Sequence, residues 1–262
     1  MTAAPEVLFP STPEEAAAAF GDGTRVTVIG GGTIVTPEIT YGRLKPEKAI
    51  MLGRAGLAGI TRYGLTFTIG AMTPVADLAH MGAPLGPCAA NVADLEIRSQ
   101  ATVGGNLCAG EGPDAPRGDL QGPLLALAAS VRSAGEGGVT TGSLEEFLPK
   151  RRQRLVLEVS FEEPAAGAFA ALDRPHTLDY TALAVSAVRA KDGTIRLAAT
   201  GAGWWGLRLP SAEAVAEDPG AAGHAALNDV QLHDDAVASA WYRERTLPVL
   251  VRRALTQLEE AA

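Results

Sequence analysis

Two glycine-rich segments, each following a predicted β-strand, constrain the fold of this 262-residue chain most strongly. The apolar run VTVI at residues 26–29 leads into GGGT at 30–33, and residues 102–103 lead into GGN at 104–106. Glycine permits positive φ and lets another group approach the backbone without meeting a Cβ atom. Successive amide N–H groups in such a turn can converge on a phosphate. One such turn is usually only a turn, but two at strand ends predict a nucleotide cofactor with two phosphates.

A Rossmann-type fingerprint explains the first glycine segment poorly. Gly30 and Gly32 supply the first half of G-x-G-x-x-G, but the third glycine would fall at Val35. We also expect Pro37 to prevent a helix from starting there. The sequence therefore disfavours a Rossmann site.

Four segments occur in an order that resembles the flavin-carrying medium subunit of the molybdenum hydroxylases, the group that contains carbon monoxide dehydrogenase and xanthine dehydrogenase. They are GGT at residues 31–33, TIGAMT at 68–73, IRSQATVGGNL at 97–107 and LLAL at 124–127. The resemblance covers nearly the whole chain, and ATVGGNL is its most specific element. It implies an α+β fold and bound FAD.

The resemblance also implies the residues of a cofactor site. Two turns would bind the pyrophosphate, one formed by Gly31, Gly32, Thr33 and Ile34, the other by Thr102, Val103, Gly104, Gly105 and Asn106. Asp119 matches an aspartate that hydrogen-bonds the ribityl chain, although it is equally suited to cap a helix at 120–129. Ile97 and Leu155 resemble residues that pack on the isoalloxazine ring, although simple core packing explains them nearly as well.

One position departs from the family pattern. Many relatives carry a lysine near the pyrimidine edge of the flavin, and the corresponding residue here is Ala171. A cation at that edge stabilises the reduced, anionic flavin. Arg174 is the alternative cation nearby in the sequence.

Composition excludes several classes of function. A net charge of −8 argues against a nucleic-acid surface, and we expect the basic cluster at residues 150–154 to be a solvated face. The sequence has no apolar run of membrane-spanning length and no signal peptide at its start, which predicts a cytoplasmic protein. Cys88 and Cys108 are too few to ligate a [2Fe–2S] cluster, which normally needs four cysteines. The four histidines show no metal-ligand spacing.

We expect an FAD-binding module of two α/β subdomains over residues 1–163 and a C-terminal α/β domain over 164–262. The main predicted helices are 13–20, 88–97, 120–129 and 236–260, and the segment 109–118 is a predicted loop. The main predicted strands are 25–29, 63–70, 102–103, 130–133 and 155–161, with paired strands at 180–190 and 193–200.

The predicted function is electron transfer by bound FAD, with no catalytic acid, base or metal ligand on this chain. The resemblance implies a small partner with [2Fe–2S] clusters and a large molybdopterin partner, arranged as a dimer of heterotrimers. The acceptor is open among NAD⁺, O₂ and a quinone. A self-sufficient FAD-dependent oxidase and a flavin-free scaffold subunit remain the alternatives.

Overall fold

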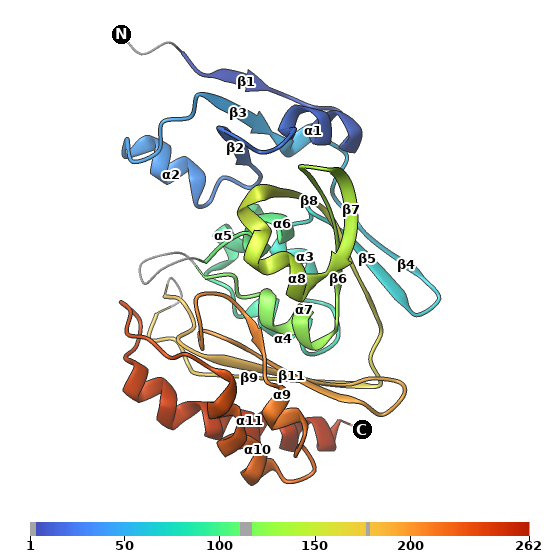
Figure 1. Ribbon diagram of the computed structural model, residues 1–262, viewed down its shortest axis with the longest axis vertical. Helices are drawn as coiled ribbons and strands as arrows, with labels where there is room; N and C mark the ends of the chain where they lie inside the picture. Colours follow the sequence, from blue (N-terminus) through green and yellow to red (C-terminus); the bar gives the residue numbers. More distant parts are fainter. Residues whose placement is uncertain (1–3, 111–116, 177–178, 262) are drawn as a thin grey trace.

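In the computed structural model the chain forms three successive layers, each built on its own β-sheet (Figure 1). The structure describes residues 4–110, 117–176 and 179–261, so most of the predicted loop at 109–118 lies outside the described residues. The arrangement confirms the expected mixed α+β class. Among the described residues, no helix has the length and apolar character that crossing a membrane requires.

The N-terminal layer is a three-stranded parallel sheet with strand order β1-β3-β2. Its elements are β1 (Glu6–Leu8), α1 (Pro13–Phe20), β2 (Val26–Ile29), α2 (Val35–Thr40), β3 (Lys48–Met51) and the 3₁₀ helix η1 (Leu52–Arg54). Thr12 caps α1, since its hydroxyl accepts the Glu15 N–H at 3.1 Å. The expectation that Pro37 would prevent a helix is wrong. Pro37 lies in the first turn of α2, where a backbone N–H has no partner within the helix.

The middle layer is a five-stranded antiparallel sheet with strand order β4-β5-β8-β6-β7 (Figure 1). Its strands are β4 (Ile60–Tyr63), β5 (Thr66–Gly70), β6 (Ser130–Gly135), β7 (Gly138–Ser143) and β8 (Arg154–Glu162). Its helices are α3 (Val75–Leu78), α4 (Leu85–Ala90), α5 (Leu95–Gln100), α6 (Val103–Leu107), α7 (Gln121–Ala126), α8 (Leu144–Phe147) and η2 (Leu148–Gln153). Their apolar side chains share one core with the sheet, in which Leu78, Leu107 and Leu124 are fully buried.

Four local predictions for this layer are wrong. The strand expected over 63–70 is interrupted, because β4 ends at Tyr63 and β5 begins at Thr66. The helix expected over 88–97 is broken between α4 and α5, because Asp94 starts a new helix by accepting the Ile97 N–H at 2.7 Å. Residues 102–103 form no strand but begin α6, which Thr102 caps. Asp119 caps no helix, since α7 begins at Gln121 and its first turn has no side-chain cap.

The C-terminal layer is a four-stranded antiparallel sheet with strand order β12-β11-β10-β9. Its elements are β9 (Ala166–Ala171), β10 (Ala184–Arg189), β11 (Ile195–Thr200), β12 (Leu207–Arg208), α9 (Pro210–Glu213), α10 (Pro219–Ala225), η3 (Ala226–Asp229) and α11 (Ala240–Glu260). The predicted pairing on either side of Gly193 is confirmed, with Val188 opposite Arg196. Helix α11 contacts β9 and β10, whereas α7 of the middle layer contacts β10 and β11. This sheet therefore joins the long C-terminal helix to the middle layer.

Candidate cofactor cavity

A cavity of about 590 Å³ runs along the middle layer and reaches both neighbouring layers. Its N-terminal end is apolar and includes Phe20, Val26 and Leu52. Its other end is polar and is lined by residues from several loops, namely Asn91, Arg117, Asp119, Asp179, Tyr180 and Thr181. Both glycine-rich segments line the cavity. Its lining suits a ligand that has different chemistry at each end.

The two glycine segments, distant in sequence, lie in direct contact beside this cavity. A Cβ atom on Gly31 would stand 1.7 Å from the carbonyl oxygen of Gln100. A Cβ atom on Gly30 would stand 2.9 Å from the hydroxyl oxygen of Thr102. Glycine is therefore required at position 31 by close backbone approach, whereas Gly32 adopts a φ of +74° that favours glycine on conformational grounds.

The first glycine segment presents free hydrogen-bond donors to the cavity. The backbone N–H groups of Gly31, Gly32, Thr33 and Ile34 donate to no acceptor among the described residues. All four residues line the cavity. Consecutive unpaired N–H groups of this kind form an anion-binding concavity. These N–H groups are therefore available to a ligand, which the predicted phosphate-binding turn requires.

The second glycine segment is different. The N–H of Val103 donates to the Thr73 carbonyl at 3.0 Å, and the N–H of Gly104 donates to the Ala71 carbonyl at 2.8 Å. The N–H of Gly105 donates to the Thr102 hydroxyl at 3.2 Å. The expectation of free, converging N–H groups in the second segment is therefore wrong, because the carbonyls of Thr73 and Ala71 and the hydroxyl of Thr102 already accept from these donors.

The glycines of α6 instead permit close packing. A Cβ atom on Gly104 would stand 3.0 Å from the Cβ atom of Ala71, and one on Gly105 would stand 3.0 Å from the Thr102 hydroxyl oxygen. The cavity thus reaches the backbone of α6 directly. Of the residues that the sequence analysis assigns to the site, only Val103 does not line the cavity, and its side chain is fully buried in the core.

Asp119 projects into the polar end instead of capping α7. Burial raises the pKa of its carboxyl group to about 6 from the ordinary 3.8, while the charge of Arg117 and a hydrogen bond with Asn106 oppose that rise. The Asn106 side-chain oxygen also accepts the Leu120 N–H at 2.8 Å. Asn106 thereby fixes the loop that carries Asp119.

Neither Ala171, which replaces the lysine of many relatives, nor Arg174, the alternative cation, is among the described residues that line the cavity. Ala171 ends β9 opposite Ala184. The Arg174 guanidinium donates to the carbonyl oxygens of Ala93, at 3.1 Å, and Asp179, at 3.2 Å. Since Ala93 and Asp179 do line the cavity, Arg174 braces its wall from behind.

More arginines surround the cavity than the sequence analysis predicts. Arg151, Arg152 and Arg154 line it together with Arg117, against two aspartates, Asp119 and Asp179. The expectation of a solvated face at 150–154 is wrong for Arg151, which is 3% exposed and lies 4.9 Å from the centre of the Trp205 ring. A chain of net charge −8 that collects arginines around one cavity favours an anionic ligand there.

The remaining reactive side chains at the cavity include one cysteine. Cys108 lines the cavity, but burial raises the pKa of its thiol to about 12, so no thiolate nucleophile forms near neutral pH. Among the residues that the structure describes, no three His, Cys, Asp or Glu side chains cluster as metal ligands.

Comparison with known proteins points to one family. The family model described as "FAD binding domain in molybdopterin dehydrogenase" matches residues 3–161. The alpha subunit of the 6-hydroxypseudooxynicotine dehydrogenase complex from Paenarthrobacter nicotinovorans is 27% identical, over 90% of this chain and 87% of that subunit.

Solved structures agree over the full length. A chain of carbon monoxide dehydrogenase from Hydrogenophaga pseudoflava, in a form lacking the Mo-pyranopterin moiety, superposes with a TM-score of 0.85 at 25% identity, covering 100% of both chains. A chain of quinoline 2-oxidoreductase from Pseudomonas putida 86 has a TM-score of 0.82 at 18% identity, covering 99% of both. The second similarity concerns the fold alone.

Proposed function

Because this chain belongs to the family of FAD-binding domains in molybdopterin dehydrogenases, we propose that it is the FAD-carrying electron-transfer subunit of a molybdenum-containing hydroxylase or dehydrogenase. The observation that carries this proposal is the row of four N–H groups at residues 31–34, which have no acceptor among the described residues and line a cavity rich in arginine. A pyrophosphate needs both features.

The residues around the cavity fit FAD. Gly31, Gly32, Thr33 and Ile34 would hold the pyrophosphate through their backbone N–H groups. Beside this segment, α6 would contribute close backbone approach at Gly104 and Gly105 and the polar groups of Thr102 and Asn106. Val103 would support α6 from the core.

We assign the flavin ring to the polar end of the cavity. Its pyrimidine edge carries both hydrogen-bond donors and acceptors, which Asn91 and Thr181 can match. Asp119 would accept from the ribityl hydroxyls, and Asn106 would hold the loop that carries it by accepting the Leu120 N–H at 2.8 Å. Ile97 and Leu155 would provide apolar contact with the cofactor.

The chain's own task is to bind FAD, orient its ring and tune its redox potential. Bound FAD supplies the redox chemistry, taking up electrons from a donor centre and passing them to an acceptor. The protein requires no general acid or base for this task, and Cys108 stays protonated. NAD⁺, O₂ and a quinone remain the candidate acceptors.

The partners in this proposal are a small [2Fe–2S] subunit and a large molybdopterin subunit, in a dimer of heterotrimers. The names of the relatives support it, since one is the alpha subunit of a dehydrogenase complex. We propose cytoplasmic residence, where the thiols of Cys88 and Cys108 stay reduced. We also propose a domain boundary at residues 163/164, because β8 ends at Glu162 and β9 begins at Ala166.

Two measurements test the proposal. Purified full-length chain should show a flavin absorption spectrum, and the released cofactor should contain adenine. A colourless protein that cannot be reconstituted with FAD would favour the flavin-free scaffold. The FAD-loaded chain alone should not oxidise aldehydes, purines, N-heterocycles or carbon monoxide. Robust turnover of any of these without partners would favour the self-sufficient oxidase.

A further inference from the structure

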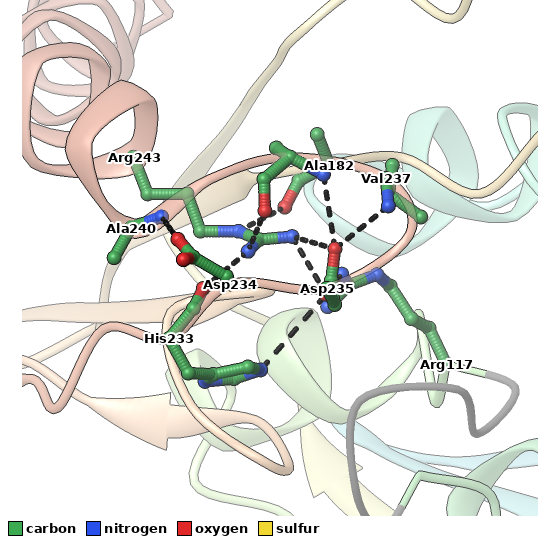
Figure 2. A network of polar contacts seen from close by, with 9 residues as sticks. Arg117, Ala182, His233, Asp234, Asp235, Val237, Ala240 and Arg243 are labelled. Carbon is green, nitrogen blue, oxygen red and sulfur yellow. Dashed lines mark hydrogen bonds and ion pairs between the residues drawn. The ribbon is translucent and has the colours of Figure 1, made fainter.

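A buried cluster of charges links the C-terminal helix to the wall of the cavity. Asp235, in the loop before α11, lies between Arg243 of α11 and Arg117 (Figure 2). The side chains of Arg243, Asp235 and Arg117 are 0%, 3% and 10% exposed. Two guanidinium groups therefore share one carboxylate away from solvent.

The Asp235 carboxylate is fully engaged. Its two oxygens each accept from Arg243 at 2.8 Å, and Oδ1 also accepts the N–H groups of Val237 at 2.8 Å and Ala238 at 2.9 Å. Burial by itself would raise the pKa of Asp235, but the hydrogen bonds from Arg243, Ala238 and Val237 and the charge of Arg117 lower it to about 2. Asp235 is thus always ionised near neutral pH.

Arg243 is neutralised more completely than Arg117. Besides Asp235, Arg243 donates to the carbonyl oxygens of Ala182, His233 and Ala238 at 3.2, 2.7 and 2.7 Å. Arg117 donates to Asp235 through Nη2, while its Nε is buried and has no hydrogen-bond partner among the residues that the structure describes. Arg117 also lines the cavity. A buried guanidinium that shares its carboxylate with a second arginine is stabilised by a further negative charge in the adjoining cavity.

The other charged groups near Arg117 do not remove the excess of positive charge that results when two arginines share one carboxylate. Burial lowers the pKa of Arg117, and the Asp235 charge opposes that effect. Asp119 is the second carboxyl group that acts on Arg117, and burial makes its own ionisation unfavourable. Arg174 adds another positive charge close enough to act on Asp119. The polar end is therefore suited to a ligand that becomes negative.

We propose that Arg117, held in place by Asp235 and Arg243, is the cation that stabilises the reduced flavin in this protein. The inference depends on the proposed function, because it requires FAD with its ring at the polar end. Two-electron reduction with uptake of one proton leaves one negative charge on the flavin ring. Partner iron–sulfur clusters supply the electrons in the complex, and dithionite supplies them in the assay. Arg117 thus takes the role for which Ala171 offers no charge.

The test is the midpoint potential of FAD bound to the full-length chain. Arg117→Gln removes the charge but leaves the Asp235–Arg243 pair intact. A nearby opposite charge shifts an ionisation equilibrium by about one to three pKa units, so reduced FAD should lose at least about tenfold in affinity relative to oxidised FAD. For a two-electron couple this lowers the potential by at least about 30 mV.

Two further variants define the outcome. Arg117→Lys keeps a charge and should restore most of the potential. Arg132→Gln removes a charge from an exposed ion pair with Glu158 outside the cavity and should leave the potential unchanged. The inference would be overturned if Arg117→Gln left the potential unchanged or if Arg132→Gln shifted it equally. It would also be overturned if Arg117→Gln weakened the binding of oxidised and reduced FAD by the same factor. A wild-type chain that binds no FAD would instead count against the proposed function.

Discussion

Replacing Gly31 by alanine tests the central feature of the cavity, the contact between its two glycine segments. The new Cβ atom would lie 1.7 Å from the Gln100 carbonyl oxygen, 2.6 Å from the Gln100 carbonyl carbon and 3.2 Å from the Ala101 Cα atom. Side-chain carbons do not approach other heavy atoms closer than 3.0 Å, so the segments must separate by about 1.3 Å. Both neighbours are backbone and cannot rotate away.

This displacement moves the N–H groups that would hold the pyrophosphate. A hydrogen bond to a charged group contributes about 1.5–3 kcal/mol, so loss of one should weaken FAD binding by about tenfold to a hundredfold. Overpacking should also lower the free energy of unfolding by about 1–3 kcal/mol. Fluorescence titration with FAD and urea unfolding of the apo-protein measure the two effects separately.

Gly53→Ala is the matched control. Gly53 is exposed in η1, and a Cβ atom there meets nothing within 4 Å. This variant should bind FAD and unfold like the wild type. If Gly31→Ala also retained wild-type affinity and stability, the close approach of the two segments and the assignment of the pyrophosphate to Gly31 would both be refuted.

Three other perturbations follow from buried groups. Burial raises the pKa of Asp119 from about 4 in the unfolded chain to about 6 in the folded protein. The contribution of this group to the free energy of unfolding is therefore greatest below about pH 4, where the carboxyl group is protonated in both states, and it falls as the pH rises through about 6. Asp119→Asn should therefore stabilise the apo-protein by up to about 3 kcal/mol at pH 7 and not at pH 4; a pH-independent difference in urea unfolding would contradict this. Asp235→Asn should destabilise by about 3 kcal/mol at pH 7, because it leaves buried Arg243 without its anion, whereas Glu158→Gln in an exposed pair should change the unfolding free energy by less than about 1 kcal/mol. The thiol of Cys88, whose pKa burial raises, should react with a disulfide reagent at pH 8 only after unfolding; rapid labelling of Cys88 in the native protein would show that it is accessible.

Local sequence patterns determined much of the fold. Thr12 and Ser143 start helices as hydroxyl caps, because each side chain bonds an N–H three residues later within the same turn. The hairpin of β10 and β11 follows from β-prone runs on either side of Asp192 and Gly193. The order of the glycine segments also indicated the family, which the match over residues 3–161 confirms.

Local patterns gave wrong predictions where a residue suited to one local role makes a different tertiary contact. Residues 102–106 read as a strand and a turn, but Thr102 caps α6 and the Gly104 N–H donates to the Ala71 carbonyl. Asp119 precedes an apolar run as a cap would, yet its carboxyl faces the cavity. Propensity is a weak prior that tertiary packing readily overrides.

Only the tertiary structure decided which side chains meet at the cavity. The contact of Gly31 with Gln100 and the pairing of Arg117 with Asp235, 118 residues further along the chain, have no local signal. Arg151 lies in a basic run that reads as surface, and it is buried because the Leu148 carbonyl and the Trp205 ring accommodate its guanidinium. The sequence by itself determined the backbone freedom at the glycines and the supply of charges. Their positions depend on long-range packing, because the energies that place a buried charge come from neighbours that only the folded chain brings together.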